Sequence, residues 1–167
     1  NLAVTWNGGT PAYDGSVAGT YVFSGALTMP SGVTNPNNLA AAVSVVVAAS
    51  SNANLSNLVI SYGTLTPAFS GETISFSASV DNSVASLTVT PTASQANASI
   101  KVNGAAVVSG TASGAVSLNA GANTIIVLVT AQDGATTKTY TIIVTRAAPV
   151  IIDVPSGGGG GGIPTYI

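Results

Sequence analysis

The sequence predicts an all-β protein, built as tandem antiparallel β-sandwiches that are followed by an extended, glycine-rich C-terminal tail. Apolar and polar residues alternate with a period of two along most of the chain, and helical periodicity is nearly absent. Turn-forming pairs such as Asn103-Gly104 and Asp133-Gly134 separate the short apolar runs. Seven or so short strands joined by such turns are typical of an antiparallel sandwich.

Residues 1–50 are expected to form a first, partial domain of three strands. The first strand carries Leu2, Val4 and Trp6 on one face, and the third covers residues 39–49. The second strand follows the turn-rich segment 7–16 and places four large apolar side chains on one face: Tyr21, Phe23, Leu27 and Met29. A Ser- and Asn-rich segment, residues 50–57, then marks a domain boundary.

Residues 51–147 are expected to form a complete sandwich. Phe76, Ala78 and Val80 continue an alternation that starts at Ile74, with Ser and Thr between them. Residues 123–131 are apolar on both faces, which predicts a central strand.

Residues 148–167 form the tail, in which six consecutive glycines separate two short apolar stretches. Pro149 and Pro155 flank the first stretch and limit it to a strand of about five residues. We expect the tail to add to the sheet edge of a neighbouring subunit, with the glycines supplying reach. The interface residues would be Val150, Ile151, Ile152, Val154, Ile163, Tyr166 and Ile167. In the alternative interpretation both ends are cut from a longer protein, and the glycines lead to a further domain.

The composition excludes several partners. Charged residues make up 5% of the chain, against about 25% in an ordinary globular protein. Lys101, Lys138 and Arg146 cannot build a basic patch, so we expect no nucleic-acid partner. No apolar run approaches the roughly 20 residues that a membrane helix needs, so no membrane insertion is expected. The sequence shows no signal peptide and begins at Asn1, so we expect a mature product or a fragment.

We expect no enzymatic activity, no cofactor and no metal. The chain has no His and no Cys, which removes the common catalytic triads and zinc-thiolate sites. The five acids fall mostly in turns and form no clustered run of the kind that Ca²⁺ needs. An adventitious calcium site at Asp81 or Asp14, completed by backbone carbonyls, stays open as an alternative.

Three further features have a structural and a functional interpretation. Lys101, Lys138 and Glu72 are candidates for an intramolecular Lys–Asn isopeptide bond, although solvated lysines are the favoured interpretation. Trp6, Tyr21 and Tyr62 could form a sugar-binding platform. Their rings, however, follow the same alternation as other apolar residues, which favours core positions. The sequons at Asn54 and Asn97 could carry glycans, with chance occurrence favoured.

Several motifs in the second domain carry a family pattern. These are Leu55 with Leu58, the LTPAF element, the VDNSVASLTVTPT segment, Val102-Asn103-Gly104, and AQDG followed by KTYTI and Arg146. Together they resemble the cadherin-like β-sandwich domain of bacterial surface proteins. In the first fifty residues, VTWN and AYDGSVAGTYVFSGAL are similar to the later half of a bacterial Ig-like repeat, of which the first two or so strands are missing.

The resemblance implies an extracellular location on the bacterial cell surface. With the low charge and the open sheet edge, it predicts a non-enzymatic structural protein that polymerises with itself into a surface filament or layer, by β-strand addition or donor-strand exchange. The alternative is a spacer, or an adhesion or carbohydrate-binding module, cut from a large surface protein or secreted carbohydrate-active enzyme. Cell-wall or host glycans would then be its partners.

Overall fold

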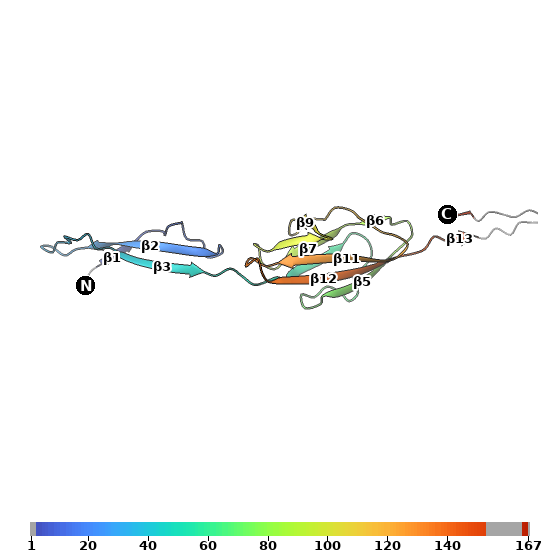
Figure 1. The fold of residues 1–167 in the computed structure, drawn as a ribbon, viewed down its shortest axis with the longest axis horizontal. Helices are drawn as coiled ribbons and strands as arrows, with labels where there is room; N and C mark the ends of the chain where they lie inside the picture. Colours follow the sequence, from blue (N-terminus) through green and yellow to red (C-terminus); the bar gives the residue numbers. More distant parts are fainter. Residues whose placement is uncertain (1–2, 153–164, 167) are drawn as a thin grey trace, which may run out of the picture. The chain divides into compact units, whose positions relative to one another are not determined.

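A computed structural model describes residues 3–152 and 165–166 of the 167-residue chain. The chain divides into two compact units, residues 1–50 and residues 51–167. All regular elements of the described residues are strands, which confirms the all-β prediction. Figure 1 shows their order along the chain.

The first unit is a single antiparallel sheet with the strand order β1-β2-β3. Its strands are β1 (Ala3–Trp6), β2 (Gly19–Thr28) and β3 (Ala41–Val47). Beyond β1, the chain keeps its pairing with β2 through a bridge between Thr10 and Val22. No second sheet faces these strands within the described part of residues 1–50.

The second unit is a sandwich, whose larger layer is a five-stranded sheet with the order β5-β12-β11-β8-β9. Its strands are β5 (Ser75–Val80), β8 (Ser99–Val102), β9 (Ala105–Val107), β11 (Gly121–Thr130) and β12 (Thr137–Arg146). All of these pairs are antiparallel except β5 with β12, which run parallel. This one parallel pair departs from the antiparallel prediction.

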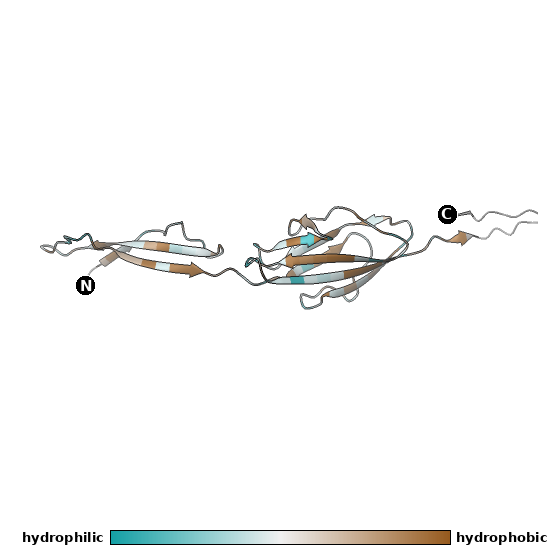
Figure 2. Cartoon of the chain, in the orientation of Figure 1, coloured by the Kyte–Doolittle hydropathy of each residue, from teal (hydrophilic) through white to brown (hydrophobic). Residues whose placement is uncertain are grey.

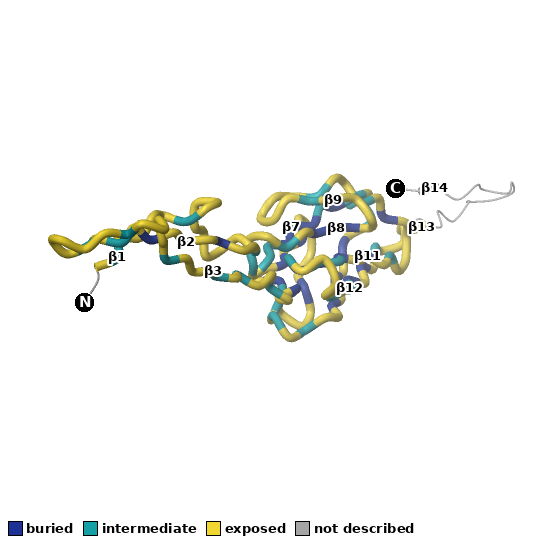
Figure 3. Tube along the Cα trace, turned by 60° about the vertical axis from the view of Figure 1, so that its left-hand side comes forward, coloured by how far each residue is buried: buried dark blue, intermediate teal, exposed yellow. Residues whose placement is uncertain are grey.

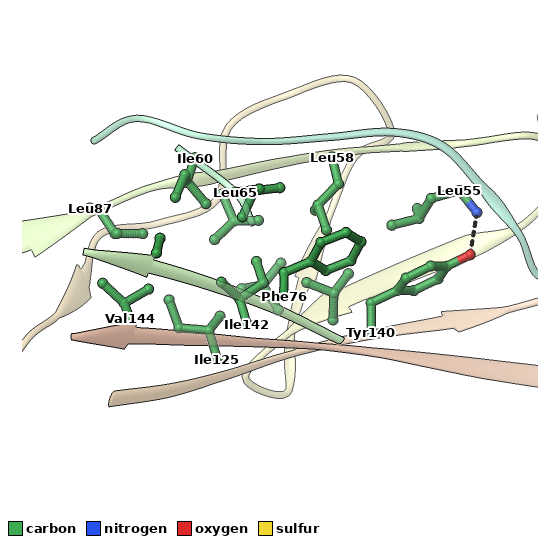
Figure 4. Close-up of a cluster of buried hydrophobic side chains, with 14 of the residues drawn as sticks. Leu55, Leu58, Ile60, Leu65, Phe76, Leu87, Ile125, Tyr140, Ile142 and Val144 are labelled. Carbon is green, nitrogen blue, oxygen red and sulfur yellow. Dashed lines mark hydrogen bonds between the residues drawn. The ribbon is translucent and has the colours of Figure 1, made fainter. Parts of the chain in front are cut away.

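Two short pairs, β4-β7 and β6-β10, form the opposite layer of the sandwich. The strands are β4 (Leu55–Ile60), β6 (Ser86–Leu87), β7 (Val89–Ala93) and β10 (Val116–Ser117). Side chains from both layers meet in one core cluster, part of which Figure 4 shows. The largest fully buried members include Tyr140, Leu55, Leu87, Ile125 and Ile142.

The local signals of the second unit are found where the sequence places them. β11 lies between β8 and β12 and buries Ile125, Val127 and Val129, as expected for a central strand. Its other face is less covered than predicted, since Ile126 is exposed. Asn103 and Gly104 both have positive φ angles, as a tight turn between β8 and β9 requires.

The tail contains β13 (Ile151–Ile152) and β14 (Thr165–Tyr166), which pair antiparallel with each other. Residues 151–152 and 165–166, which lie on either side of the glycines in the sequence, therefore pair with each other. The sequence pattern predicts two strands here but not their pairing with each other.

Candidate assembly surface

One face of the first sheet is apolar and only partly covered. The strand register places Val4 opposite Leu27 and Trp6 opposite Gly25, and it places Val43 opposite Phe23 and Val45 opposite Tyr21. Opposite residues point to the same side of a sheet. The face therefore carries Val4, Trp6, Tyr21, Phe23, Leu27, Val43 and Val45. We call it the open face.

The segment after β1 covers part of the open face. The Tyr13 ring lies edge-on to the Tyr21 ring at 5.1 Å between centroids and tilted to the Phe23 ring at 5.8 Å. The Tyr21 hydroxyl donates a hydrogen bond to the Val17 carbonyl at 2.8 Å. Tyr21 is accordingly 3% exposed, and it is the one large apolar side chain that is buried among the described residues of this unit.

The rest of the open face is only partly covered, and Val4, Phe23, Leu27 and Val45 are half-buried. Trp6 packs against the backbone of Gly25 but is still 46% exposed, and Val43 is also exposed. Figure 3 shows the contrast: buried segments are common in the second unit and rare in the first. Three strands without a second layer cannot enclose a core of their own.

Two of the three aromatic residues that were expected in a core are therefore exposed. The core interpretation is correct for Tyr21 but wrong for Trp6, because no second sheet lies over its side of β1 in the described residues. It is also wrong for Tyr62, which lies in a bend after β4 and is 54% exposed. Trp6 and Tyr62 belong to different units.

β3 is an edge strand with a free row of backbone groups. Val22 exchanges backbone hydrogen bonds with Thr10, at 2.8 and 3.1 Å, so its polar groups point away from β3. Since these directions alternate along a strand, Tyr21 and Phe23 pair with β3, through Val45 and Val43. Ala42, Ser44 and Val46 must then direct their N–H and C=O groups away from β2.

Nothing in the described residues pairs with this outer side of β3. The strand AAVSVVV carries no charge and no proline, the usual devices that keep edge strands apart. Figure 2 shows its apolar colouring. An edge of this kind is a template for a strand from another chain.

The C-terminal tail contains the short strands β13 and β14, and the structure describes only part of it. Val150 and Ile151 are exposed, and Ile151 and Ile152 pair with Tyr166 and Thr165. Three predicted interface residues lie outside the described residues: Val154, Ile163 and Ile167.

Two of the acids, Asp14 and Asp133, accept hydrogen bonds within turns. Within the described ranges, no three His, Cys, Asp or Glu side chains gather in a group that could hold a metal ion. The Asp133 carboxylate accepts hydrogen bonds from the Thr136 hydroxyl at 2.6 Å and from the backbone N–H groups of Thr136 and Ala135. These bonds lower the pKa of Asp133, and the bond from the Thr136 hydroxyl has the largest effect. Hydrogen bonds from the Ser16 hydroxyl and N–H lower the pKa of Asp14 in the same way.

Of the two lysines considered for a covalent cross-link, Lys138 lies beside an asparagine. Its Nζ donates to Asn54 Oδ1 at 2.8 Å and to the Gly71 carbonyl at 3.0 Å. Lys101 and Glu72 are exposed. Lys138 is thus a hydrogen-bonded donor, and the Asn54 side chain of the first sequon is engaged by it. The pair joins positions 84 residues apart, and the sequence carries no signal that would reveal it.

Comparison with known proteins identifies the second unit. Residues 55–147 match the profile of the cadherin-like beta sandwich domain family. A protein from Evansella cellulosilytica, named "Putative membrane protein", is 43% identical over 98 residues. That match covers 59% of this chain and 15% of the relative's length.

No helix in the described part of the chain is long and apolar enough to cross a membrane. The matched region coincides with the sandwich of β4 to β12, with its single enclosed core and its paired outer layers. More than half of the chain lies within it. The chain belongs to the cadherin-like β-sandwich domain family.

Proposed function

We propose that this chain is a non-enzymatic building block of the bacterial cell surface, and that copies of it join into a filament or layer by β-strand addition. The tail of one copy would add to the outer side of β3 in the next. The observation that carries this proposal is the first unit's free β3 edge beside its partly covered open face.

The chemistry of the two surfaces supports this pairing. Residues 1–50 carry a single charge, that of Asp14, and the tail carries a single charge, that of Asp153. Contact between such segments meets little like-charge repulsion and buries few ions. Because a tail and an edge are different surfaces, the contact is heterologous, and it extends into a filament unless it closes into a ring.

Charge placed on the β3 edge tests the proposal. Val46→Lys adds an ammonium group beside the free backbone row, and Val108→Lys adds the same group at an equally open position of the second unit. Val46 is 71% exposed and Val108 is 72% exposed, so the two variants are matched in charge and exposure. We expect electron microscopy and sedimentation to show assemblies for the wild type and Val108→Lys, and monomers for Val46→Lys.

Removal of residues 148–167 tests the other half of the contact. Filaments that persist after this deletion would exclude the tail as the added strand. Assemblies that persist in Val46→Lys would exclude the β3 edge.

A second function, as an adhesion or glycan-binding module, rests on Tyr62. This exposed ring lines a shallow hollow of the second unit together with Ser79 and the carboxylate of Asp81. An aromatic face beside a hydrogen-bond acceptor suits a neutral sugar. A monomeric solution mass together with a glycan-array signal that Tyr62→Ala abolishes would favour this function over assembly.

A further inference from the structure

The chain enters and leaves the second unit at opposite ends of one long strand. Leu55, the first residue of β4, lies beside Tyr140 near the start of β12. Figure 4 shows Leu55 at the Tyr140 end of the core and Val144 toward the other end. β12 ends at Arg146, where the chain leaves the sandwich. The ten residues of β12 span about 30 Å, so tension on the two ends acts along this strand.

β12 is paired along its whole length on one side and over residues 141–146 on the other. It pairs with β11 over ten residues and with β5 over six. Ladder hydrogen bonds lie across the strands, so a pull along β12 loads many of them together. A pull across the strand would instead open the ladder one pair at a time.

The entry point is tied directly to β12. Lys138 Nζ donates to Asn54 Oδ1 at 2.8 Å, and the Leu55 N–H donates to the Tyr140 hydroxyl at 2.9 Å. We call these two bonds the entry clasp. The clasp matters because β4 itself pairs with β7 alone, and their register is irregular between Leu55 and Asn57. Load that arrives at residue 54 therefore passes into β12 as well as into this shorter ladder.

The exit point is tied to two loops of the same unit. Arg146 Nη1 donates to the Leu118 carbonyl at 2.7 Å, and its Nε and Nη2 donate to the Asn82 carbonyl at 2.9 and 2.6 Å. The Ala147 N–H donates to the Val80 carbonyl at 3.0 Å, and Asn82 Nδ2 donates to the Ala147 carbonyl at 2.9 Å. We call this group the exit clasp.

Cations are scarce in this chain, and their placement is informative. The sequence has three Lys and Arg residues, and two of them are used at the entry and the exit of the sandwich. The third, Lys101, is exposed on β8. Hydrogen bonds from a charged group are about twice as strong as neutral ones, so these two sites are reinforced above the rest of the surface.

We propose that residues 51–147 are a load-bearing link, in which the two clasps pass tension from one end of the chain to the other through β12. This function is independent of how copies assemble, since a monomeric spacer under flow or cell-surface tension would use it equally.

Single-molecule force spectroscopy on the full chain tests the proposal. The chain has no cysteine, so one cysteine added at each terminus gives unique handles. The 97 residues from 51 to 147 extend to about 330 Å, so unfolding of the sandwich should lengthen the chain by about 300 Å. At constant force we expect this step to occur about tenfold faster in Lys138→Met than in the wild type, because unfolding under force is governed by the unfolding rate. Lys101→Met, the matched control, should stay within twofold.

A second geometry tests the same idea without changing either clasp. Handles at Ser51 and Ala135 place both attachment points at the entry end of β12, so force acts across the strand. We expect unfolding at least tenfold faster at equal force than with terminal handles. Equal lifetimes in the two geometries would overturn the proposal, and so would equal effects of Lys138→Met and Lys101→Met. The comparison of the two handle geometries keeps Lys138, so it tests the proposal even if Lys138→Met does not fold.

Discussion

The Tyr140 hydroxyl offers the sharpest test of how the sandwich is stabilised. Tyr140 is 0% exposed, and its hydroxyl accepts the Leu55 backbone N–H at 2.9 Å. Tyr140→Phe keeps the ring and its packing but removes the acceptor. The Leu55 N–H, which belongs to a residue 1% exposed, would then be buried without a partner.

The expected loss follows from that orphaned donor. A buried N–H left without a partner costs about 1–3 kcal/mol, so we expect a loss of about 2 kcal/mol in the free energy of unfolding. For a unit of this size, each kcal/mol lowers Tm by about 4–8 °C. The transition of the second unit should therefore move down by roughly 8–16 °C.

Urea and thermal denaturation followed by far-UV circular dichroism measure this loss. The one tryptophan of the chain, Trp6, lies in the first unit, so its fluorescence follows that unit separately. Tyr62→Phe is the control, because it removes an exposed hydroxyl and should leave the midpoint unchanged. An unfolding free energy for Tyr140→Phe within about 0.5 kcal/mol of the wild type, with an unchanged m value, would refute the reasoning.

Three other changes test individual features. Gly25→Ala places a methyl group on Val4 and Trp6, so it should destabilise the first unit by about 1–3 kcal/mol and shift the Trp6 fluorescence transition. Gly63→Ala combines a φ of +80° with a contact of 2.8 Å to the Ser79 carbonyl, so it should lower the Tm of the second unit, whereas Gly114→Ala, which meets open space, should not. The pKa of Asp133 is lowered in the folded chain, so its ionised carboxylate stabilises the fold. This stabilisation is fully present above the ordinary carboxyl pKa of about 3.9, and it is lost as the pH falls through the lower pKa of the folded state. Wild-type stability should therefore drop below about pH 4 by an amount that Asp133→Asn lacks, measured as Tm against pH with Asp81→Asn as the charge control.

The local signals in the sequence predicted turns and single strands of the second unit. Asn103-Gly104 tolerates the positive φ angles that the β8–β9 turn requires, and Asp133 caps the β11–β12 turn through its own side chain. The apolar run of β11 marks a central strand, because both of its neighbours are strands of the same sheet. Turn chemistry and period-two alternation are properties of adjacent residues, so they can be recognised in one sequence.

Pairings between distant residues could not be predicted in this way. β5 lies parallel beside β12, and Lys138 binds Asn54, in both cases more than sixty residues apart. Alternation predicts that a strand has an apolar face but not which strand lies next to it. The wrong prediction of a core position for Trp6 has the same origin. Trp6 lies on the same face of β1 as Val4, but a residue of this face is buried only where a second layer covers it.

The two units differ in what their strands leave unsatisfied, and this difference connects the fold to the proposed assembly. In the sandwich, the apolar faces of both layers meet each other, and its buried side chains form one cluster. In the first sheet, the same kind of alternation produces an apolar face on which Tyr21 is the one large side chain that is buried among the described residues. It also produces an edge whose Ala42, Ser44 and Val46 lack backbone partners there. Apolar area and unpaired backbone groups both favour contact with a further strand. One strand added along β3 would satisfy the backbone groups and place its own side chains beside Val43 and Val45. A contact built in this way depends little on ions, so its strength should change little with salt concentration, in contrast to assemblies held by surface charge.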